Sequence, residues 1–79
     1  MATITNDLLK QIADNATAHA NAIKVGDTFT GAFGAAALYG YTDGPERSLF
    51  TVIWLSIWEA RKGIASGPFD GPCTVERID

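Results

Sequence analysis

The sequence predicts a small, mainly α-helical domain, a three-helix bundle followed by an extended C-terminal tail. Apolar residues recur with a helical period over residues 7–24, and helix start and stop signals bracket residues 44–62. Gly-Pro pairs then interrupt the chain at Gly67 and Gly71. With 79 residues, the chain is expected to form a single domain over residues 1–79.

The first helix is expected over residues 7–24. Thr5, Asn6 and Asp7 offer N-caps and negative charge at its start, and Gly26 is a natural residue to follow its end. At 100° per residue, one face collects an apolar stripe that would pack on the core. This stripe consists of Leu8, Ile12, Ala16, His19 and Ile23.

The second helix is expected from Asp27 to Tyr39, with a buried face made by Phe29, Phe33, Ala36 and Ala37. Its interior glycines, at positions 31 and 34, each cost about 1 kcal/mol relative to alanine. The alternative is an α+β fold, with a strand near residues 28–33 that pairs with a second strand near residues 73–78. Because a strand needs a partner, either both segments are strands or neither is.

The third helix is expected to begin at residues 43–46, where Asp43 or Gly44 can cap and Pro45 suits the first turn. It should end at Lys62, since Arg61 and Lys62 favour the last turn and Gly63 follows.

This third helix carries more apolar residues than two short neighbours can cover. Phe50, Trp54 and Trp58 form a second stripe beside the main one, and Val52 and Leu55 lie on still other faces. One interpretation makes the helix central and both tryptophans core. The other keeps Trp58 and Trp54 partly exposed beside Arg61, as anchors for another chain, because Trp and Arg dominate interface energetics.

Net charge is −3, with nine acidic residues against six Lys and Arg, which argues against broad nucleic-acid binding. Asp70, Glu76 and Asp79 cluster in the tail and could dock on a partner with a basic surface. A helix-turn-helix protein that binds DNA is a further alternative, but the third helix offers only Arg47 near its start.

An enzyme is not expected, because no nucleophile, base and oxyanion donor are assembled. His19 is the only histidine and is expected to be a half-buried residue that shares one hydrogen bond. The single cysteine, Cys73, excludes an internal disulfide and a cysteine-based zinc site, and no cofactor is expected. No secretory signal opens the chain, and its longest apolar stretch, residues 49–58, is too short to span a bilayer, so a cytoplasmic location is expected.

In its small size, acidic charge and single-domain character, the chain resembles the small anti-CRISPR inhibitor proteins encoded by phages. That resemblance implies a non-enzymatic inhibitor that binds a bacterial nucleic-acid-processing complex, such as a set of Cas subunits, and occludes it. It covers the type of chain rather than a stretch of residues, so no residue role is carried over. The alternatives are an antitoxin-like interaction module and a structural homo-oligomer that buries its tryptophan face against itself.

Overall fold

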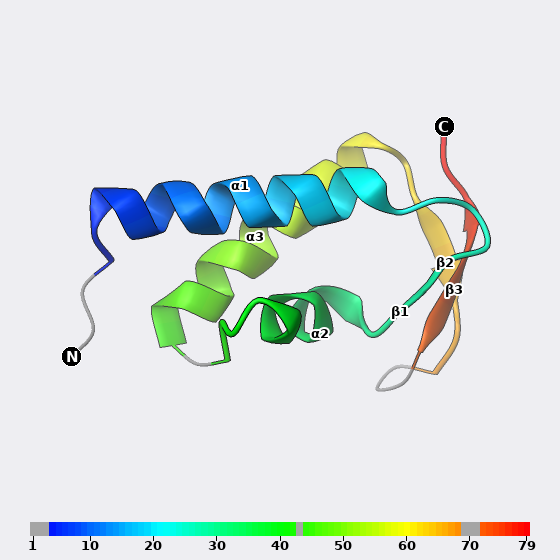
Figure 1. The fold of residues 1–79 in the computed structure, drawn as a ribbon. Helices are drawn as coiled ribbons and strands as arrows, with labels where there is room; N and C mark the ends of the chain where they lie inside the picture. Colours follow the sequence, from blue (N-terminus) through cyan, green and yellow to red (C-terminus); the bar gives the residue numbers. More distant parts are fainter. Residues whose placement is uncertain (1–3, 43, 69–71) are drawn as a thin grey trace.

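The computed structural model describes residues 4–42, 44–68 and 72–79, and over these residues it confirms a mainly α-helical fold (Figure 1). A small antiparallel sheet adds the strands that the alternative prediction contained. The elements, in chain order, are α1 (Asn6–Ala22), β1 (Thr28–Phe29), α2 (Gly31–Leu38), α3 (Gly44–Ala60), β2 (Ile64–Ser66) and β3 (Cys73–Arg77).

Helix α1 begins and packs as its sequence predicts. The Thr5 hydroxyl accepts a hydrogen bond from the backbone N–H of Leu8, which satisfies one of the free donors at the helix start. Of the predicted stripe, Ile12, Ala16 and Ile23 are buried, and Leu8 and His19 are half-buried, so the stripe faces the core. The helix ends at Ala22, two residues before the expected end.

The turn after α1 depends on a glycine. Gly26 has a φ of +93°, a conformation that residues with a Cβ rarely adopt. The Asp27 carboxylate accepts a hydrogen bond from the backbone N–H of Lys24, at 2.9 Å. These two features reverse the chain and start β1 at Thr28.

The two linked strand predictions are both confirmed in part. Thr28 and Phe29 pair with Thr74 and Cys73, so both segments form strands, as the linked prediction required. However, helix α2 begins at Gly31, which corrects both the helix expected from Asp27 and the strand expected to reach residue 33.

The expected buried face of α2 is wrong in part: Ala36 is buried as expected, but Phe33 and Ala37 are not. Its buried residues are Ala32, Ala35 and Ala36, whereas Phe33 and Ala37 are exposed. The expected face was aligned on Phe29, and Phe29 belongs to β1 instead of the helix. Helix α2 therefore contributes only alanine side chains to the core, so its backbone packs close to the neighbouring elements.

Helix α3 has the expected start but ends at Ala60, two residues before the expected end at Lys62. Lys62, instead of the expected Gly63, takes the left-handed conformation, with a φ of +56°. The backbone N–H of Gly63 donates to the carbonyl of Trp58 at 3.2 Å, and that of Lys62 donates to Glu59 at 3.0 Å. These bonds satisfy carbonyls that the end of a helix leaves free.

Strand β3 is the middle strand of the sheet, in the order β1-β3-β2, and both of its neighbours run antiparallel to it. The expected extended tail is therefore part of the core, and Val75 within it is buried. Strand β2 was not predicted. A bulge between Ile64 and Ala65 interrupts its pairing.

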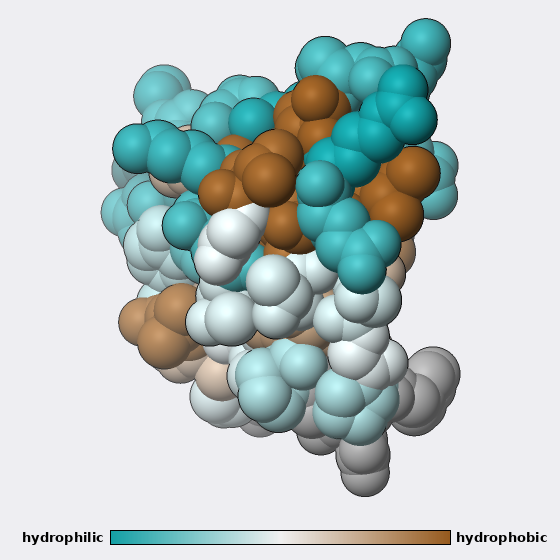
Figure 2. All heavy atoms as spheres, turned by 90° about the vertical axis from the view of Figure 1, so that its right-hand side faces the viewer, coloured by the Kyte–Doolittle hydropathy of each residue, from teal (hydrophilic) through white to brown (hydrophobic). Residues whose placement is uncertain are grey.

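The three helices form two layers, with the sheet at one end (Figure 1). Helix α3 packs against both α1 and α2, whereas α1 and α2 barely touch. Seen from its own side, the sheet end shows apolar areas broken up by hydrophilic side chains (Figure 2). None of the helices in the described part of the chain is long and apolar enough to cross a membrane.

Candidate functional site

Trp54 belongs to the core, which corrects the prediction that it is a surface anchor. It is 1% exposed, and its ring stacks on Trp58, with centroids 5.7 Å apart and planes at 22°. The ring of Phe29 packs on it at 5.4 Å. A partner could reach Trp54 only if these neighbours moved away.

Trp58 is half-buried and is held on several sides. Phe29 contacts its ring edge to face at 5.4 Å, and Trp54 stacks against it. A Cβ built on Gly63 would lie 2.4 Å from three atoms of the Trp58 ring, so the ring lies directly on that glycine. These contacts make Trp58 mainly a packing residue, with only part of its ring open to a partner.

Arg61 connects the ends of two helices. Its guanidinium Nη1 donates a hydrogen bond to the carbonyl of Ala20, in the last turn of α1. The last four carbonyls of a helix have no hydrogen-bond partner within the helix, and they lie at the negative end of its dipole. The Arg61 guanidinium supplies both a hydrogen-bond donor and a positive charge there. Arg61 therefore contributes to the fold as well as to the surface.

The predicted acidic edge is mixed in charge. Asp79 lies 3.9 Å from the Lys62 ammonium and 3.5 Å from Nε of Arg77, and the Glu76 carboxylate accepts a hydrogen bond from Ser66 at 2.6 Å. Asp70 lies outside the described residues. The nearby cations reduce the negative potential that Glu76 and Asp79 would offer to a basic partner.

His19 is half-buried and shares a hydrogen bond, as predicted. The indole Nε1–H of Trp54 donates to its Nδ1 at 2.9 Å. Because an indole can only donate, Nδ1 must be unprotonated, and the imidazole is held neutral with its proton on Nε2. Burial also lowers the pKa of His19 below its ordinary value of 6.5.

This lowered pKa predicts a pH-dependent stability. Below pH 6.5 the unfolded chain binds a proton at His19 that the folded chain does not, so the free energy of unfolding should fall as the pH falls. Thermal unfolding between pH 7.5 and 5.5 should show a decreasing Tm. In this range, histidine is the only side chain that ordinarily titrates.

The control for this experiment is His19→Gln, whose amide oxygen can still accept from Trp54. We expect its Tm to be nearly constant over the same pH range. A wild-type Tm that does not change with pH would contradict the prediction.

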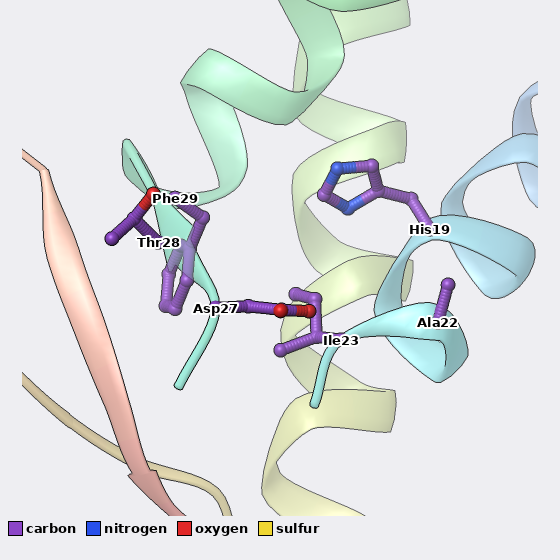
Figure 3. A pocket seen from close by; sticks show the side chains of 6 residues that line it. All are labelled: His19, Ala22, Ile23, Asp27, Thr28 and Phe29. Carbon is purple, nitrogen blue, oxygen red and sulfur yellow. The ribbon is translucent and has the colours of Figure 1, made fainter. Parts of the chain in front are cut away.

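Two adjoining hollows lie between α1, β1 and α2, with volumes of about 350 and about 220 Å³. His19, Thr28 and Phe29 line both of them. Figure 3 shows the imidazole reaching from α1 toward β1, with the Asp27 carboxylate at another part of the wall. His19 accepts from Trp54, and Asp27 accepts from the turn at Lys24, so both side chains already have structural roles.

The outer face of α2, made by Phe33, Ala37 and Leu38, is the surface that sequence reasoning missed. Phe33 is 56% exposed and Leu38 is 78% exposed. The guanidinium of Arg47 lies over the Phe33 ring, 4.5 Å from its centroid. The signal was present in residues 31–38, which contain no polar side chain, so any exposed face of that helix has to be apolar.

No family model matches the sequence, and no match was found among the curated proteins or the solved structures.

Proposed function

We propose that this protein is a non-enzymatic inhibitor that binds a bacterial nucleic-acid-processing complex and occludes it, as anti-CRISPR proteins do. The observation that carries the binding role is the outer face of α2. Large apolar side chains at this level of exposure, grouped on one helix, are typical of interaction sites. The type of target rests on the resemblance of the chain to phage-encoded inhibitors.

The chemistry of the α2 face suits a protein partner. An aromatic ring, an arginine and a leucine are the kinds of side chain that fill pockets at protein interfaces. Arg47 over Phe33 also holds the ring in place, because a cation over an exposed aromatic face contributes about 0.5–1 kcal/mol. A ring already ordered before binding loses less entropy when it is buried.

The exposed side of α3 favours a protein partner over DNA. It presents Ser48, Val52, Leu55 and Glu59, none of which is a cation that would contact phosphates. The arginine near its start, Arg47, is placed over Phe33.

The test is a double substitution on α2, Phe33→Ser with Leu38→Ser. Both side chains are exposed, so the fold should persist, while removing the two largest apolar side chains of this face should weaken binding at least about tenfold. The readout is transformation of a plasmid that is targeted by an active CRISPR system, together with capture of Cas subunits by the tagged protein.

The matched control is Leu9→Ser, an exposed leucine of α1 that lies outside the α2 face. We expect wild type and this control to protect the plasmid and capture the subunits, and the double variant to do neither. If the double variant protects as well as wild type, the α2 face is not the contact. If wild type neither protects the plasmid nor captures a subunit, the proposed function is wrong.

A further inference from the structure

We propose that the outer stripe of α3, made by Ser48, Val52, Leu55 and Glu59, binds a second copy of this chain in an antiparallel helix pair. All four side chains are exposed, with Val52 at 62% and Leu55 at 40%. Helices α1 and α2 both pack against α3 (Figure 1). The buried Phe50 and Trp54 lie on the side of α3 opposite the stripe, so the stripe faces away from the rest of the fold.

The spacing of the stripe is that of a helix–helix seam. Its members are four, three and four residues apart, which is the a/d spacing of a heptad pattern. The two apolar residues occupy the middle and the two polar residues occupy the ends. A short seam with an apolar centre and a polar rim is the usual build of an interface.

The stripe is complementary to itself in the antiparallel orientation. A two-fold axis that passes between residues 53 and 54 places Val52 opposite Leu55 of the second copy, and Ser48 opposite its Glu59. Every contact then occurs twice, as a two-fold symmetric interface requires. A parallel pair in register would instead place Glu59 against Glu59, where like charges repel.

Charge favours the same orientation. Within its own chain, Glu59 lies in the last turn of α3, where the negative end of the helix dipole disfavours a carboxylate. In the antiparallel pair, it moves close to the first turn of the second α3, where free N–H groups and the positive end favour it. The Ser48 hydroxyl opposite can donate a hydrogen bond to this carboxylate.

Ser56, a polar residue beside the seam, would not be left unpaired. Ser56 is exposed next to Val52 and Leu55, and its hydroxyl donates to the carbonyl of Val52 at 2.8 Å. Because this bond lies within α3, covering Ser56 would not strand a buried donor. A seam of four positions is smaller than the interfaces of tight dimers, so we expect dissociation in the micromolar range.

The first test is sedimentation equilibrium between about 1 and 500 µM. Wild type should shift from monomer to dimer over this range, and Leu55→Lys should raise the dissociation constant at least tenfold. The control is Leu9→Lys, a leucine of nearly equal exposure, at 43%, on α1, which should dimerise like wild type. A wild type that stays monomeric throughout, or a Leu55→Lys variant that dimerises unchanged, overturns the proposal.

The second test reads the orientation by disulfide formation, with linked peptides identified by mass spectrometry. Ser48→Cys and Glu59→Cys are made as separate proteins and then mixed. The antiparallel pair should link position 48 of one copy to position 59 of the other. Two copies of position 48 would be about 16 Å apart along the seam, beyond the reach of a disulfide. A link between two positions 48 would refute the antiparallel pair.

Discussion

Trp54→Ala is expected to destabilise this protein more than any other single truncation. Trp54 is the largest of the fully buried side chains, and such a change in a core costs about 3–5 kcal/mol. A domain of this length typically has a free energy of unfolding of about 4–12 kcal/mol. Thermal unfolding followed by circular dichroism should therefore show a Tm lowered by roughly 15–30 °C, or no cooperative transition at all.

The expected loss of stability has two causes, the missing ring and the missing hydrogen bond to His19, and a second variant separates them. Trp54→Phe keeps most of the buried ring but removes the indole N–H that donates to His19. Its loss of stability should be about 1 kcal/mol, from the missing hydrogen bond, together with the small cavity left by the lost ring. Without the indole donor, His19 can take a proton on Nδ1, so the fall in Tm at low pH should also become smaller.

The same experiment decides between the two sequence interpretations of the tryptophans. An exposed anchor predicts that truncation leaves the fold intact and weakens only partner binding. A Trp54→Ala protein with wild-type Tm would contradict the packing described here. Trp58→Ala should follow the same direction with a smaller loss, because Trp58 is only half-buried.

Helices α1 and α3 were predictable because the signals that specify each of them lie within its own residues. An N-cap threonine and an apolar stripe specify α1, and a Gly-Pro-Glu start specifies α3. The strands were harder, since β1 has two residues and β2 has three, too few for an alternating pattern. Their existence depends on pairing with β3, which is far away in sequence.

The error about Trp54 follows from the error about β1. The predicted helix from Asp27 to Tyr39 included Phe29 and placed its ring on the buried face of that helix. In the fold, β1 brings the Phe29 ring onto both Trp54 and Trp58. The periodicity of α3 correctly showed more apolar faces than its neighbours could cover, and the faces left open are those of Val52 and Leu55.

Gly63→Ala is the second substitution with a large expected effect, although it adds a single methyl group. The new Cβ would lie 2.4 Å from the Trp58 ring, far inside normal contact distance. The ring cannot simply rotate away, because Trp54 stacks on it and Phe29 contacts it edge to face. Overpacking of this kind costs about 1–3 kcal/mol, so chemical denaturation should give a lower midpoint with an unchanged slope.

A double-mutant cycle assigns this cost to the ring. In a Trp58→Leu background, the flat indole that meets the new methyl is gone, so Gly63→Ala should cost much less than it does in wild type. A strained backbone at residue 63 would instead give the same cost in both backgrounds. The contact between Gly63 and Trp58 would then not hold the indole in place. The half-buried ring of Trp58 could in that case turn toward a partner.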